Sequence, residues 1–145
     1  MKREDKYPET KSFIYFNANP RKRLTCDCWL RAVCTALEED YNDVLRGLCE
    51  VHIKTGYELS DSKAIDIYLK GKGWVKCQQP RKRDNTKYTG KEFCKWVSDK
   101  GYGNLICNIG GHHMVAIKPV GKYYKVHDTW DSTDGCIGNY WRKAV

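Results

Sequence analysis

The sequence predicts a single α+β domain, residues 1–145, in which N-terminal helices pack on a C-terminal antiparallel sheet. Apolar residues recur at helical spacing in several segments between residues 27 and 100. After residue 102 the pattern changes to short apolar segments separated by glycine turns, as in a sheet of hairpins. Helices that precede strands along the chain favour the α+β class. A chain of 145 residues also has the usual length of one domain.

Four helices are expected before the sheet. The first begins near Asp27, with Thr25 or Asp27 as its N-cap. Its apolar stripe consists of Trp29, Ala32, Val33, Ala36 and Leu37. The second and third cover about Asn42–His52 and Asp61–Lys70, and Ser60 opens the third. The fourth starts at the capping box Thr89-x-x-Glu92 and ends before Gly101.

The strands are expected in the C-terminal part of the chain. They cover Asn104–Ile109, His113–Val120, Lys122–His127 and Cys136–Trp141, with turns at Gly110-Gly111 and Val120-Gly121. Residues 1–26 show little periodicity. We interpret residues 1–16 as an N-terminal arm, with a short extended piece at Phe13–Phe16. Residues 71–88, with many charges and one proline, are predicted to form a long surface loop.

The formal charge of +8 would suit an anionic partner such as nucleic acid or a cell wall. Two basic triplets, Arg21–Arg23 and Arg81–Arg83, each follow a proline, and we interpret both as solvated loops. No apolar run reaches the roughly 20 residues that cross a bilayer, so no membrane partner is expected. The charged N-terminus lacks the apolar stretch of a secretory signal, which predicts a cytoplasmic protein.

Eight cysteines could form a disulfide framework, but such frameworks belong to secreted proteins. We therefore expect reduced thiols. Cys94 and Cys107 lie in apolar runs, where cysteine behaves as a small buried hydrophobe.

One cysteine stands where a nucleophile would be activated. A thiol attacks a carbonyl only as the thiolate, and the positive end of a helix dipole lowers its pKa. Cys28 lies at the predicted start of the first helix, whereas Cys26 lies outside it and Cys34 lies in its interior. Cys28 is thus the candidate nucleophile.

A histidine and an acid can complete this site. Among the four histidines, His112 and His113 open a strand directly after turn glycines. His113 shares its side of the strand with Val115 and Ile117, the more consistently apolar set, which we expect to face the Cys28 helix. Asp128 ends the next strand, and a tight antiparallel turn would bring it beside His113.

The chain resembles known papain-like proteins at three motifs. These are Asp27-Cys28-x-x-Arg31-Ala32, Gly111-His112-His113-Met114-Val115-Ala116-Ile117, and Asp128-Thr129-Trp130-Asp131-Ser132 followed by Tyr140-Trp141. They are similar to those of a family of short papain-like proteins of bacterial and phage genomes, and to the C39-like, bacteriocin-processing peptidases. The resemblance runs from about Asn17 to Trp141 and implies the papain-like cysteine protease fold.

The resemblance also implies roles for single residues. Cys28 would be the nucleophile, His113 the base and Asp128 the group that orients the base. Papain-like enzymes usually place a glutamine five or six residues before the cysteine, as the oxyanion donor, whereas here those positions hold Arg23 and Lys22. Asn17 or Asn19 could serve as the oxyanion donor instead, together with the Cys28 backbone N–H.

These residues predict a cysteine peptidase or isopeptidase that acts on a peptide or protein substrate through an acyl-enzyme, without cofactor or metal. A zinc site would have to use Cys26, Cys28, His112, His113 and Cys136, whose spacing does not fit finger motifs. Two other functions stay open. One is a peptidoglycan amidase or endopeptidase of the phage-lysin type, and the other is a catalytically inactive basic binding module on the same fold.

Overall fold

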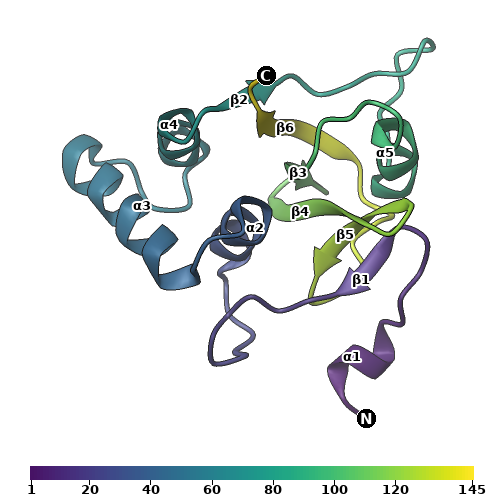
Figure 1. The fold of residues 1–145 in the computed structure, drawn as a ribbon, viewed down its shortest axis with the longest axis horizontal. Coiled ribbons are helices and arrows are strands. Elements are labelled where there is room, and N and C mark those ends of the chain that lie inside the picture. The colour runs from purple at the N-terminus through teal and green to yellow at the C-terminus, as the bar shows by residue number, and fades with distance from the viewer.

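The computed structural model describes all residues, 1–145, and contains one six-stranded sheet with helices on both faces (Figure 1). The strands are β1 (Phe13–Tyr15), β2 (Trp74–Cys77), β3 (Leu105–Ile109), β4 (His113–Val120), β5 (Tyr123–Asp128) and β6 (Ile137–Lys143). Their order across the sheet is β1-β5-β4-β3-β6-β2. The α+β class is therefore confirmed.

The four predicted helices are present, and a short additional helix begins the chain. The helices are α1 (Arg3–Lys6), α2 (Cys28–Leu37), α3 (Tyr41–Thr55), α4 (Ser62–Gly71) and α5 (Gly90–Val97). Thr89 and Glu92 form the predicted capping box at the start of α5. The N-cap of α4 is Asp61 rather than Ser60, because the Asp61 carboxylate accepts from the Lys63 backbone N–H.

The sheet is mixed, so the prediction of an antiparallel sheet is wrong at one edge. Strand β1 pairs in parallel with β5, with Phe13 opposite Val126 and Tyr15 opposite Asp128. The Phe13 side chain is fully buried in the core, which fixes this segment of the predicted arm as a strand. A strand of three residues is too short to show a clear period in the sequence, but the burial of one large aromatic side chain stabilises it.

The other edge also differs from the prediction. Strand β2 lies inside the segment 71–88 that was expected to be a surface loop, and it pairs antiparallel with β6. Trp74 is buried against the core, whereas Val75 and Lys76 face solvent. A charged side chain such as Lys76 is ordinary on an edge strand, and together with the exposed Val75 it hides the strand pattern in the sequence.

Two hydrophobic cores fill the two faces of the sheet. One lies under α2, α3 and α4, and the other lies under α5 (Figure 1). Along β4, Met114 and Ala116 belong to the first core, whereas Val115 and Ile117 belong to the second. The expectation that Val115 and Ile117 face the helix that carries Cys28 is therefore wrong. Both sets are apolar because both faces are covered.

No helix combines the length and apolar character needed to cross a bilayer. All eight cysteines are free thiols.

Trp141 is a sensitive test of the core on the α2 side. Its side chain is 0% exposed, and its indole Nε1–H donates to Asp66 Oδ1 at 3.0 Å. We expect Trp141→Ala to lower the free energy of unfolding in urea by about 3–5 kcal/mol, since it opens a cavity in the core and removes the hydrogen bond to Asp66. The control is Ile53→Ala, at a side chain that is 80% exposed. That change should stay within about 0.5 kcal/mol, and equal losses would contradict the assigned packing.

Candidate active site

The three residues predicted to act together meet at one end of the sheet. Cys28 is the first residue of α2, His113 the first of β4 and Asp128 the last of β5. His113 Nε2 lies 2.5 Å from Asp128 Oδ2. The same imidazole lowers the pKa of the Cys28 thiol, and Nδ1 is the ring nitrogen that Asp128 leaves unoccupied. The contact forms at the ends of these elements, which is why strand parity did not govern it.

Asp128 is fixed by more than the histidine. Its side chain is 1% exposed. Oδ1 accepts from the Thr129 backbone N–H at 2.7 Å, and Oδ2 accepts from the Ser132 hydroxyl at 3.0 Å. Since both oxygens have fixed partners, the carboxylate holds the imidazole ring in one orientation.

Arg31 joins the helix to the strand and was not assigned a role from the sequence. Its Nε donates to Asp27 Oδ1 at 2.8 Å, and its Nη1 donates to Asp128 Oδ1 at 3.3 Å. Burial opposes its charge, but the two carboxylates outweigh this and raise the pKa of Arg31 further. The four-residue spacing of Asp27 and Arg31 was the available signal for this ion pair. The contact with Asp128 depends on tertiary structure.

The N-terminal turn of α2 is left open beside the thiol. Asp27 occupies the N-cap position, but its side chain does not cap the helix. Instead its Oδ2 accepts from the Tyr41 hydroxyl at 2.7 Å and from Asn19 Nδ2 at 3.0 Å. First-turn N–H groups have no acceptor within a helix. The N–H groups of Cys28 and Trp29 are therefore available, with the positive end of the helix dipole, to a negative charge.

The two asparagines suggested as oxyanion donors serve the preceding loop instead. Asn17 Nδ2 donates to the Arg23 carbonyl at 3.3 Å, and its Oδ1 accepts from the Asn19 backbone N–H at 3.0 Å. Asn19 Nδ2 donates to Asp27, as described above. Neither side chain lines the cleft next to Cys28. The backbone N–H groups at the start of α2 replace them as the candidate donors.

The site favours a thiolate paired with an imidazolium. Burial alone would raise the pKa of Cys28, but hydrogen bonds from His113 and from the Met114 backbone outweigh it and lower that pKa. The positive charge of Arg31 acts in the same direction. Burial also opposes the charge of His113, yet hydrogen bonds to Asp128 and Cys28 raise its pKa to about 9.

Three other cysteines have a raised pKa, the opposite of the shift at Cys28. Burial raises the pKa of Cys34 to about 11 and that of Cys94 to about 12. It also holds the pKa of the fully buried Cys107 well above its ordinary value. No group of three or more His, Cys, Asp or Glu side chains is placed to hold a metal ion.

Two clefts flank the Cys28–His113 pair. The first, of about 490 Å³, is lined by Cys26, Cys28, Trp29, Ser60, Ser62, Asn108, Gly111, His112 and Met114. The second, of about 370 Å³, is lined by Ile109, Gly110, His112, His113, Trp130, Asp131, Ser132, Asp134 and Gly135. The Trp130 ring lies over His113, with centroids 5.1 Å apart, and remains 39% exposed. A bound chain could therefore contact both sides of the thiol.

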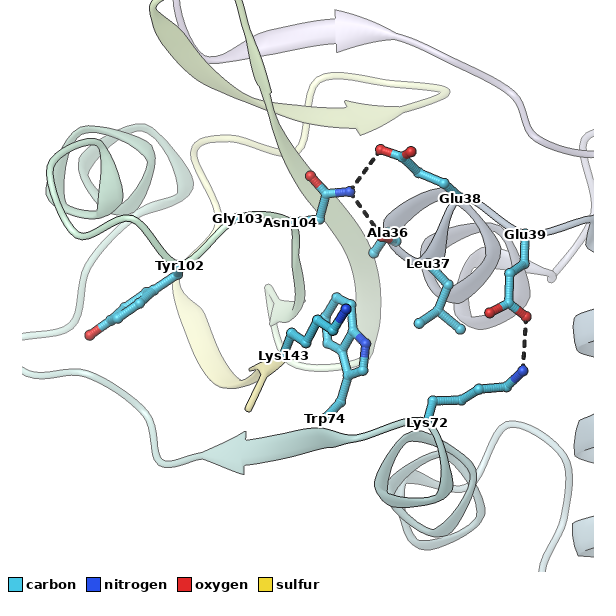
Figure 2. Close-up of a pocket in the computed structure, with 10 residues that line it drawn as sticks. All are labelled: Ala36, Leu37, Glu38, Glu39, Lys72, Trp74, Tyr102, Gly103, Asn104 and Lys143. Atoms are coloured by element: carbon cyan, nitrogen blue, oxygen red, sulfur yellow. Dashed lines mark hydrogen bonds and ion pairs between the residues drawn. The ribbon is translucent and has the colours of Figure 1, made fainter. Parts of the chain in front are cut away.

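A third pocket, of about 340 Å³, lies at the opposite end of α2 (Figure 2). Four of its polar side chains bind in pairs: Asn104 Nδ2 donates to Glu38 at 3.1 Å, and Lys72 pairs with Glu39 at 3.1 Å (Figure 2). These pairs connect the end of α2 to neighbouring segments. Cys28, at the other end of α2, does not line this pocket.

Comparisons with protein-family models, with curated proteins and with solved structures find no match to this chain.

The geometry predicts how Cys28 reacts with iodoacetamide. Because the thiolate forms above a lowered pKa, Cys28 should be alkylated first at neutral pH, and its rate should fall as pH decreases through that pKa. His113→Ala removes the main stabilising partner, so the pKa rises and the rate at neutral pH should fall about tenfold or more. Mass spectrometry of the modified peptides gives both rates.

His112→Ala is the matched control, because His112 lines both clefts but takes no part in the contacts described for Cys28. It should leave the pH dependence of alkylation unchanged. A larger loss in His112→Ala than in His113→Ala would assign the base to His112.

Proposed function

We propose that the protein is a papain-like cysteine hydrolase that cleaves a peptide or isopeptide bond through an acyl-enzyme. The observation that carries the proposal is the continuous contact from Cys28 through His113 to the buried carboxylate of Asp128. The order of nucleophile, base and acid along the chain agrees with the papain-like resemblance. The papain-like fold is likewise part of this proposal, beyond the α+β class.

In the first half of the proposed reaction, the Cys28 sulfur attacks the carbonyl carbon and the oxygen becomes an oxyanion. The open N–H groups of Cys28 and Trp29 can donate to that oxygen. The His113 imidazolium then gives its proton to the leaving nitrogen as the C–N bond breaks. An amine leaves, and the acyl group remains on sulfur as a thioester.

In the second half, His113 is neutral and takes a proton from water. The hydroxide attacks the thioester, the C–S bond breaks, and the carboxylic acid product leaves. Asp128 remains a carboxylate throughout and stabilises the imidazolium when it forms again.

The flanking clefts support a chain-like substrate rather than a small amide. One cleft is lined by Cys28 and the other by His113, and each also includes exposed residues, Cys26 in the first and Asp134 in the second. Ser60 and Ser62 in the first, and Asp131 in the second, offer hydrogen-bonding groups to the substrate on either side of the cleaved bond.

Labelling with a peptide-based electrophilic probe tests the nucleophile. A peptidyl vinyl sulfone should modify Cys28 alone among the eight thiols, and Cys28→Ala should abolish labelling. A peptide library incubated with the protein and read by mass spectrometry should show new termini that are absent with Cys28→Ala. Labelling without turnover of peptides or of peptidoglycan fragments would leave a binding module as the better function. Labelling of another cysteine would exclude the proposed nucleophile.

The pH profile of turnover tests Asp128. Thiolate is lost as pH falls through the lowered Cys28 pKa, and imidazolium is lost as pH rises through the His113 pKa of about 9, so the profile should be bell-shaped. Asp128→Asn removes the charge that raises the His113 pKa, and the alkaline limb should move to lower pH. Asp131→Asn should leave both limbs in place. Asp128→Asn should also lower the free energy of unfolding more than Asp131→Asn does, since Asp128 is buried and Asp131 is not.

A further inference from the structure

A cleft of about 480 Å³ lies between α5 and the β1–β5 edge of the sheet, away from the candidate active site. It is lined by Lys11, Ser12, Lys91, Cys94, Lys95, Ser98, Lys122, Tyr123 and Tyr124. We call it the lysine cleft. Its four lysines come from three separate segments of the chain: the residues before β1, helix α5 and the β4–β5 turn.

The charge of the lysine cleft is largely unneutralised. No aspartate or glutamate lines it. Lys91 pairs with Asp134, whose side chain is 89% exposed, and Lys11, Lys95 and Lys122 form no ion pair. By contrast, Lys82 of one basic triplet is already paired with Glu92. The three unpaired ammonium groups repel one another, and an anion in the cleft would offset that repulsion.

Tyr123 holds two of these cations at the wall of the cleft. The Lys11 ammonium lies 5.9 Å from the centre of its ring, and the Lys122 ammonium lies 5.3 Å from it. Such cation–π contacts restrict the positions of both ammonium groups. Lys91 and Lys95 approach from α5 on the other wall, one helical turn apart. The cleft therefore presents cations from two sides.

We propose that the lysine cleft binds a ligand that carries two or more linked phosphate groups. Lysine ammonium groups act as point charges toward phosphate oxygens, whereas planar carboxylates are best matched by the arginine fork. No arginine lines the cleft. Cations on opposite walls suit a ligand with several charged groups better than one small anion.

The lysine cleft is separate from the Cys28 site. Lys122 and Tyr123 lie at the β4–β5 turn, whereas Asp128 lies at the far end of β5. A strand advances about 3.3 Å per residue, which places the two sites roughly 17 Å apart along β5. Helix α5 also lies on the face of the sheet opposite α2 (Figure 1). The inference does not depend on the proposed hydrolase activity.

Isothermal titration of the full chain with inorganic tripolyphosphate tests the proposal, with citrate at matched ionic strength as the carboxylate comparison. We expect saturable binding of tripolyphosphate that weakens with added salt, and much weaker binding of citrate. The double variant Lys95→Gln, Lys122→Gln should weaken tripolyphosphate binding about tenfold or more. The Cys28→Ala variant should bind as the unmodified protein does.

The control removes the same charge elsewhere, with Lys2→Gln and Lys54→Gln, both at exposed positions outside the cleft. Its affinity should stay within about twofold. Thermal unfolding without ligand checks that each variant folds, and the single variant Lys122→Gln serves if the double variant does not. Equal binding of citrate, or equal losses in the two double variants, would overturn the proposal.

Discussion

The buried carboxylate of Asp128 is the group on which the arrangement of the candidate site depends. An ionised side chain that is 1% exposed must be paired, because removing a partner from a buried charge costs about 3–5 kcal/mol. Arg31 pairs with it from α2, and His113 contacts it from β4. The same electrostatic requirement thus holds the helix that carries Cys28 against the strands that carry the other two residues.

The edge strand β1 extends this dependence to the N-terminal residues. The Phe16 backbone N–H donates to the Asp128 carbonyl at 2.9 Å, and Arg3 donates to the Thr129 carbonyl at 2.7 Å. Both contacts fix the backbone around the carboxylate. The segment after β1 then places Asn19 beside Asp27. The hydrogen bond from Asn19 to the Asp27 carboxylate keeps that carboxylate from capping the start of α2. An open helix terminus is the consequence, and a thiolate at Cys28 is the charge that such a terminus favours.

The hairpin formed by β4 and β5 separates two electrostatic environments. Its open end holds His113 and Asp128, whereas its turn holds Lys122 in the lysine cleft. The exposed acidic side chain of Asp134 lies in the cleft beside His113 and pairs with Lys91 of the lysine cleft.

The sequence by itself determined helices α2 to α5, the C-terminal strands and an extended piece near Phe13, because local features specify them. It also singled out Cys28, His113 and Asp128 as candidates. Caps, turn glycines and helical periodicity act over a few residues. Only the tertiary structure decided the rest. Strands β1 and β2 gain stability from Phe13 and Trp74 in cores that distant segments complete. Arg31 reaches Asp128 across 97 positions of the chain, a contact that no local pattern encodes.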